Sequence, residues 1–156
     1  MKWWPLTGIK NYFTEKKDYS NNCKINRIID GKIFKKSLFV FVIDVGNSNL
    51  LNFTIKALKA PQFNIHRFGI FFTETPRHAD LLVVLGPLNN RMKEPLVETI
   101  AQMPKRCGVL IINEDTIVEN NMNDIEIPDI VAEIDRNITP DELLSLLLEI
   151  AKGDFK

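Results

Sequence analysis

Short runs of almost unbroken apolar residues are the feature that most constrains the fold of this chain. Each run is rich in β-branched or aromatic residues and is too short for a buried helix, which is typical of a strand covered on both faces. A fifth, less apolar strand is predicted at IVAEID, residues 130–135. The four apolar runs are SLFVFVIDVG at 37–46, HRFGIFFTE at 66–74, ADLLVVLG at 79–86 and CGVLIIN at 107–113.

Helical patterns alternate with these strands. Residues 47–60 are predicted as a helix that Pro61 stops, and residues 90–103 repeat apolar side chains at helical spacing before Pro104. A last helix should begin at TPDEL, with Thr139 as N-cap and Glu142 three residues later. This alternation predicts an α/β fold: a three-layer sandwich around a mostly parallel, flavodoxin-like sheet of about four to five strands.

The composition changes near residue 37. Residues 1–36 are interpreted as an N-terminal extension, and residues 37–156 as the α/β domain. The extension contains Trp3 and Trp4 among several large apolar side chains, so we expect it to contact a partner or a membrane interface. The alternative is that it folds back over the domain's own sheet or helices.

Charge and cysteine content exclude several functional classes. The 20 basic residues balance the 20 acidic ones, and the absence of a long basic block argues against nucleic acid as a partner. Cys23 and Cys107 have no zinc or disulfide spacing, which indicates a reducing, intracellular environment. The longest apolar run, residues 38–43, is too short for a membrane span, and no signal peptide is visible.

In an open α/β sheet, ligand-binding and catalytic residues usually lie in the loops that follow the carboxyl ends of the strands. The first such loop, DVGNSNLLN, lacks both the second glycine of a dinucleotide-binding motif and the Gly-Lys-Ser/Thr of a phosphate loop, which favours an ordinary turn. Ser48 lacks the glycine-flanked elbow of a nucleophile, and His66 and His78 lack further ligands at metal-binding spacing. The residues alone therefore indicate an α/β domain without a convincing active site. The predicted loops begin at Asp44, Thr73, Gly86, Asn113 and Asp135.

A longer segment resembles a known family. HRFGIFFTETPRHADLLVVLGPLNNRM, residues 66–92, is similar to a segment shared by the small subunits of energy-converting nickel-iron hydrogenases and formate hydrogenlyases and by the B-type (PSST, 20 kDa) subunit of respiratory complex I. In that family an Arg-Phe-Gly strand leads to Ser-Pro-Arg-His-Ala-Asp, an aliphatic strand and Gly-Pro-Val; here Thr75 replaces the serine. The resemblance extends over residues 37 to about 152.

The resemblance also locates four missing residues. Relatives hold a [4Fe–4S] cluster with four cysteines, and this chain has Ser48, Leu51, Glu114 and Arg136 at those positions. Because such clusters need thiolate ligands, the resemblance implies a member without the cluster, without another metal and without electron transfer.

The implied function is that of a non-catalytic, structural or regulatory subunit in a membrane-associated hydrogenase or complex I-like oxidoreductase. It would pair with a large (complex I D-type-like) subunit and lie in the cytoplasm, held at the inner face of the cell membrane by its partners. One alternative is a stand-alone domain that binds a nucleotide or flavin at the carboxyl edge of the sheet. Another is an iron-sulfur electron carrier, as in the family at large.

The resemblance further implies that Arg77 and His78 lie at the subunit junction near the cluster positions. They are therefore predicted to contact the partner. The alternative is that Arg77 caps a carbonyl group or pairs with Asp80 within the domain.

Overall fold

One sheet organises the whole molecule. The computed structural model describes residues 24–25, 37–114 and 125–152. Five parallel strands form the body of the sheet, and a two-residue strand, β1, pairs antiparallel with β6 at one edge. The order across the sheet is β1-β6-β5-β4-β2-β3. The bounds are β1 Lys24–Ile25, β2 Leu38–Asp44, β3 Ile70–Phe72, β4 Leu81–Leu85, β5 Gly108–Asn113 and β6 Ile130–Asp135.

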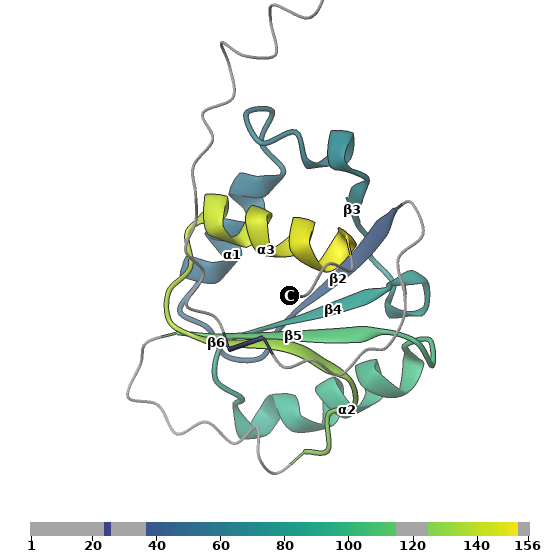
Figure 1. The fold of residues 1–156 in the computed structure, drawn as a ribbon. Coiled ribbons are helices and arrows are strands. Elements are labelled where there is room, and N and C mark those ends of the chain that lie inside the picture. The colour runs from purple at the N-terminus through teal and green to yellow at the C-terminus, as the bar shows by residue number, and fades with distance from the viewer. Residues whose placement is uncertain (1–23, 26–36, 115–124, 153–156) are drawn as a thin grey trace, which may run out of the picture.

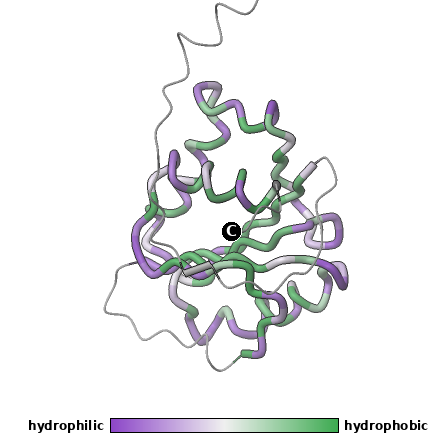
Figure 2. The backbone as a smooth tube through the Cα atoms, viewed as in Figure 1, coloured by the Kyte–Doolittle hydropathy of each residue, from purple (hydrophilic) through white to green (hydrophobic). Residues whose placement is uncertain are grey.

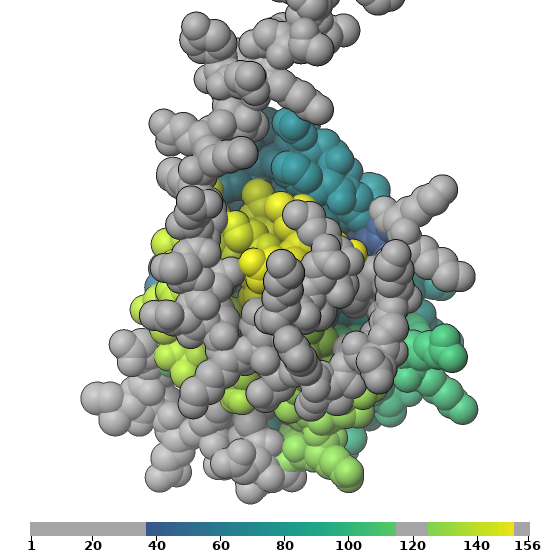
Figure 3. Space-filling model, in the orientation of Figure 1, coloured from purple at the N-terminus to yellow at the C-terminus, as the bar shows by residue number. Residues whose placement is uncertain are grey.

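Helices cover both faces of the sheet. α1 (Leu50–Leu58) and α3 (Pro140–Lys152) lie together on one face, and α2 (Lys93–Gln102) lies on the other (Figure 1). These three layers confirm the predicted α/β fold around a mostly parallel sheet. In the space-filling view, the segment around η2 (Ile65–Phe68) lies beside α3, and Ile65 is buried in the same core as that helix (Figure 3).

The aliphatic runs fold into the centre of the sheet because both faces are covered. All residues of β4 and β5 are buried. Alternate side chains enter separate cores: Leu81, Val83 and Leu85 face α1 and α3, whereas Leu82 and Val84 face the α2 side. Figure 2 shows the resulting hydrophobic centre, with hydrophilic residues along the loops and outer helix faces.

The second predicted strand is shorter in the structure. Residues 66–74 were expected to be extended, but the 3-10 helix η2 takes up their beginning, and β3 is only three residues long. Asn64 and Gly69, which flank η2, both have positive φ angles (42° and 78°) that turn the backbone away from a strand. The expectation of one continuous strand over residues 66–74 is therefore wrong.

Two of the helices begin later in the structure than the sequence predicted. α1 begins at Leu50 and not at Asn47, because Asn49 has a φ angle of 76° that a right-handed helix cannot contain. The predicted 90–103 helix divides into a 3-10 turn, η4 (Asn90–Met92), and α2.

At α3, the predicted capping box is present. The Glu142 N–H donates to Thr139 Oγ1 at 3.4 Å, and the Thr139 N–H donates to Glu142 Oε2 at 3.1 Å. The two residues thus satisfy each other's backbone donors at the start of the helix.

Part of the predicted extension reaches the sheet, since β1 lies within residues 1–36 and pairs Lys24 with Glu133. Trp3 and Trp4 lie outside the described residues. Within the described part of the chain, none of the helices has the length and apolar content needed to cross a membrane.

Candidate functional site

The loops at the carboxyl edge of the sheet form the candidate site. Because β2 and β4–β6 are parallel, the segments that follow Asp44, Leu85, Asn113 and Asp135 meet at this one edge. These loops contain Ser48, Glu114 and Arg136, three of the four residues that the resemblance aligns with the family's cysteines. The fourth, Leu51, lies in the first turn of α1.

Glu114 and Ser48 are brought into contact although 66 residues separate them. The Ser48 N–H donates to both carboxylate oxygens of Glu114, each at 3.0 Å. Glu114 is only 7% exposed, whereas Ser48 is exposed, so the bond is partly buried. A hydrogen bond to a charged acceptor is among the stronger ones in proteins, and this one ties the β2–α1 loop to the end of β5.

Leu51 belongs to the hydrophobic core. It is 1% exposed and lies in the same cluster as Ile138, which precedes α3. One turn later, the Thr54 hydroxyl lies within hydrogen-bonding distance of two carbonyl oxygens, that of Leu50 in its own helix at 3.2 Å and that of Ile138 in the β6–α3 loop at 3.4 Å. Leu51, which the resemblance aligns with a cluster ligand, is therefore a packing residue in this chain.

Arg136 is also engaged within the chain. Its Nη1 lies 3.2 Å from Glu142 Oε2, with the two side chains 40% and 25% exposed. The pKa of Glu142 is lowered, first by the Thr139 N–H and then by hydrogen bonding and attraction to Arg136. Arg136 thus reinforces the capping box of α3.

These four residues do not fit a [4Fe–4S] cluster. A cluster needs four thiolates, whereas this set offers a hydroxyl, a carboxylate, an aliphatic side chain and a cation. Cys107 does not supply a substitute, because it lies just before β5, at the opposite edge of the sheet. Burial raises the pKa of the Cys107 thiol, and the charge of Asp129 raises it further, so this thiol is protonated near neutral pH.

Asp44 organises the first loop. Its Oδ1 accepts the N–H groups of Gly46 and Asn47 at 3.0 and 3.1 Å, and its Oδ2 accepts from the Asn52 side chain at 2.7 Å. Together with Glu114, it occupies the three successive N–H groups of residues 46–48. A phosphate at this point would find those donors taken and two carboxylates nearby, which disfavours an anion site.

Sequence reasoning identified the loops but missed several residues that shape them. Asn113 donates through Nδ2 to Asp135 Oδ1 at 2.7 Å and joins the ends of β5 and β6. Its Oδ1 and the Asn47 Nδ2 are buried without a hydrogen-bond partner. The available signal was the position of each polar residue, since a predicted loop begins at each of Asp44, Asn113 and Asp135.

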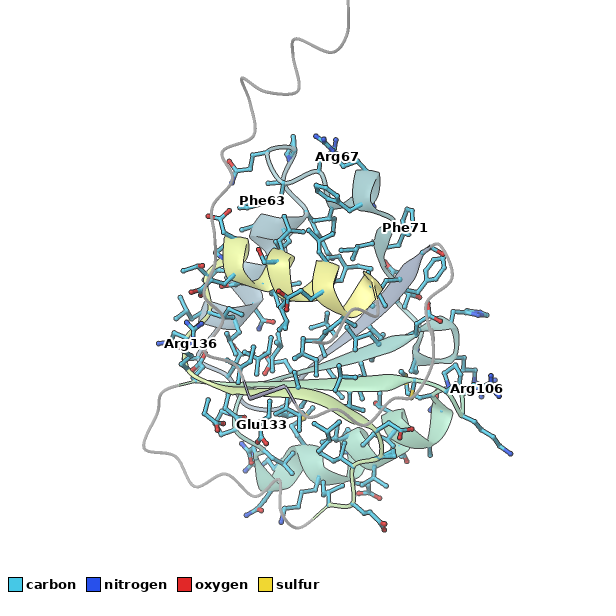
Figure 4. All side chains as sticks on the ribbon, viewed as in Figure 1. Phe63, Arg67, Phe71, Arg106, Glu133 and Arg136 are labelled. Carbon is cyan, nitrogen blue, oxygen red and sulfur yellow. The ribbon has the colours of Figure 1, made fainter. Side chains whose placement is uncertain are left out.

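Arg77 and His78 do not join the four positions. They lie in η3 (Pro76–His78), just before the amino end of β4, whereas Arg136 lies at the carboxyl edge. Figure 4 shows Arg136 on one side of the molecule and Arg106, which precedes β5, on the other. Both η3 residues are exposed, and their contact with a partner stays a prediction.

The alternative role of Arg77 finds no support among the described residues. The Asp80 carboxylate accepts the Phe39 N–H at 3.0 Å, and no hydrogen bond or ion pair links it to Arg77 in the described part of the chain. Asp80 instead fastens the start of β4 to the start of β2.

Comparison with known proteins gives a consistent set of relatives. The chain is 36% identical over 78 residues to formate hydrogenlyase subunit 7 of Escherichia coli, covering 49% of this chain and 31% of the relative. It is 34% identical over 81 residues to the probable membrane-bound hydrogenase subunit mbhJ of Pyrococcus furiosus, covering 52% and 48%. It is 32% identical over 88 residues to NAD(P)H-quinone oxidoreductase subunit K of Nostoc punctiforme, covering 56% and 36%. The matches thus span less than half the length of these relatives.

A comparison of folds agrees with these sequence relatives. A chain of the membrane-bound sulfane sulfur reductase, an archaeal respiratory membrane complex, superposes with a TM-score of 0.54 at 20% identity, covering 77% of this chain and 73% of that one. A search with protein-family profiles gives no match. The relatives confirm the resemblance that the sequence of residues 66–92 predicted.

Proposed function

From its homology to subunits of hydrogenase and quinone oxidoreductase complexes, we propose that this chain is a non-catalytic subunit of a membrane-associated complex of that kind. It acts as a structural or regulatory component beside a large subunit and holds no iron-sulfur cluster. The observation that supports this proposal most directly is the Ser48–Glu114 bond, in which two positions equivalent to cluster ligands satisfy each other.

The carboxyl edge offers a surface for the partner. Leu50 is 48% and Phe53 is 62% exposed on the first turns of α1, directly after Ser48. Exposed apolar side chains of this size, side by side on one helix, are suited to a protein interface. The hydrogen bonds that Asp44 and Glu114 accept from backbone N–H groups fix the loop in front of these side chains, so the surface can form without a metal centre.

Iron content tests the absence of the cluster. The chain is purified anaerobically from cells supplied with iron, and iron and acid-labile sulfide are measured per chain. We expect no stoichiometric iron and no broad iron-sulfur absorbance, because the ligand positions lack thiols. About four irons per chain would contradict the proposal and restore the electron-carrier alternative.

Partner association is tested separately by tagging the chain in its native host and identifying co-purifying proteins. A hydrogenase- or complex I-like large subunit is expected, and Phe53→Ser should reduce its recovery. Val97→Ser is the matched control, since Val97 is 48% exposed on α2, on the opposite face of the sheet. Recovery of the chain alone would refute the assignment to a complex.

The nucleotide or flavin alternative predicts binding to the free chain. The N–H groups of residues 46–48 already donate to Asp44 and Glu114, so we expect no binding of ATP or FMN in a titration. Micromolar binding would favour this alternative over a subunit role.

A further inference from the structure

We propose that the carboxyl edge of the sheet binds one internal water molecule, which bridges the side chains of Asn47 and Asn113. We call this the bridging-water site and define it by the Asn47 Nδ2 donor and the Asn113 Oδ1 acceptor. Both atoms are buried, and neither has a hydrogen-bond partner within the described part of the chain. Buried polar groups are almost always paired, either with protein or with ordered water. The inference goes beyond the proposed subunit role and does not depend on it.

The orientation of each amide is fixed by its other end. The Asn47 Oδ1 accepts the Asn49 N–H at 2.6 Å, so the amide nitrogen points away from that bond. The Asn113 Nδ2 donates to Asp135 Oδ1 at 2.7 Å, and an ionised carboxylate can only accept. Turning either amide over would break one of these bonds, so neither orphaned atom can be satisfied in that way.

The two asparagines lie in segments that run alongside each other. Their neighbours in the sequence are in direct contact, because the Ser48 N–H donates to both carboxylate oxygens of Glu114 at 3.0 Å. Gly86 adjoins both segments. Its N–H donates at 2.7 Å to the carbonyl group of the residue before Asn113, and a Cβ on Gly86 would lie 2.7 Å from the Asn47 Cβ.

The alternation of β5 directs the Asn113 side chain. Val109 and Ile111 face the core on the α2 side, so Asn113 continues that row. Its Nδ2 is turned toward Asp135 at the end of β6, and its Oδ1 is therefore turned the other way, toward β4. That is the strand whose end packs against Asn47.

Water suits this donor and acceptor better than a direct bond does. The Asn47 backbone is held in place, since its N–H donates to Asp44 Oδ1 at 3.1 Å and its nitrogen would lie only 2.5 Å from a Cβ on Gly86. The side chain is held as well, by the Asn49 N–H. A water molecule can accept from Nδ2 and donate to Oδ1 without moving either residue.

The same two atoms disfavour an ion. A cation would meet the hydrogens of the Asn47 Nδ2, and an anion would meet the Asn113 Oδ1. Asn113 is only 5% exposed, so the ligand is a small neutral molecule that both donates and accepts hydrogen bonds. Water is the molecule of this class that is present in every solution of the protein.

Water-selective nuclear magnetic resonance tests the proposal on the full, isotope-labelled chain. Magnetisation is transferred from water to the side-chain amide protons. We expect the Asn47 amide to show a cross-peak with the sign of a long-lived bound water, and the amide of Asn137, which is exposed, to show only fast-exchanging surface water. Surface-type behaviour at both amides would overturn the proposal.

A substitution removes one side of the bridge. Asn113→Leu keeps the size of the side chain but removes the acceptor, so the long-lived signal at Asn47 should be lost. Asn137→Leu is the matched control, at an exposed position, and should leave that signal unchanged. Persistence of the signal in Asn113→Leu would show that the water does not bridge these residues. If Asn113→Leu does not fold, the wild-type spectrum and the crystal structure decide.

A crystal structure of the wild-type chain grown in rubidium chloride separates water from a cation. We expect a density peak at about 2.7–3.2 Å from both Asn47 Nδ2 and Asn113 Oδ1, without an anomalous signal from rubidium. An anomalous peak at this place would assign the site to a monovalent cation instead. A direct hydrogen bond between the two amides would equally overturn the proposal.

Discussion

At the scale of single residues, two carboxylates fix the loops at the carboxyl edge of the sheet. Glu114 holds the loop of Ser48, and Glu142 holds Arg136 and the start of α3. Both accept hydrogen bonds from backbone N–H groups and thereby hold loops in place. The sequence predicted the role of Glu142 because the capping box is local, but Glu114 reaches a partner 66 residues away, which no local pattern shows.

Glu114→Ala should lower the free energy of unfolding by about 1–3 kcal/mol, because it leaves the Ser48 N–H unpaired at a part-buried site. Urea unfolding of the purified chain measures the change. Glu98→Ala is the control, since Glu98 is exposed on α2 and its replacement should cost about half a kcal/mol or less. Equal effects of the two substitutions would show that the Ser48–Glu114 bond contributes no net stability.

Glu142 makes a contribution to the stability of the fold that depends on pH. Since its folded-state pKa lies below its ordinary value, its stabilisation is complete above the unfolded pKa and is lost as the pH falls through the lowered folded value. Wild type and Glu142→Gln should therefore differ in urea midpoint at pH 7 and converge in acid. Glu98→Gln, at an exposed position, serves as the reference. A difference that is constant with pH would contradict the linkage.

At the scale of elements, the sequence predicted the long apolar strands and the helices well because periodicity and burial agree. β6 coincides with the predicted IVAEID run, and β4 and β5 lie inside their predicted runs. Prediction failed at β3, where positive-φ turns at Asn64 and Gly69 shorten the strand. The candidate site could be located only as a set of loops, because its contacts join segments that are far apart in the sequence.

Close backbone packing of two loops fixes the carboxyl edge. Gly86 has a φ of 88°, and a Cβ there would lie 2.5 Å from the Asn47 nitrogen. Gly86→Ala should therefore cost about 2–4 kcal/mol in unfolding free energy, because strain and a backbone clash combine. Gly69→Asn is the comparison, since asparagine tolerates the left-handed conformation at φ 78° and should cost about 1 kcal/mol or less. A mild effect of Gly86→Ala would mean that the two loops separate readily.

At the scale of the whole molecule, the sheet is the structural unit, and β1 is the part of residues 1–36 that the structure describes. β1 contributes two paired residues beside β6. Deletion of residues 1–36 should leave cooperative thermal unfolding and reduce the free energy of unfolding by about 1–2 kcal/mol. Circular dichroism during heating measures this.

Deletion of α3 should have a much larger effect on folding than deletion of residues 1–36. Leu143, Leu146, Leu147 and Ile150 are each at most 1% exposed, so a chain that ends at residue 139 should not fold. If removing residues 1–36 also abolished cooperative unfolding, the extension would be an integral part of the domain.

The burial of Leu51 limits what this position can hold. A cysteine at position 51 would be smaller than the leucine and would leave a void beside Ile138, so this substitution alone would cost stability. Glu114 and Arg136 also make contacts that a thiol at either position would remove. A designer who wished to install a cluster at this edge would therefore have to rebuild the packing of α1 and both loop contacts at the same time.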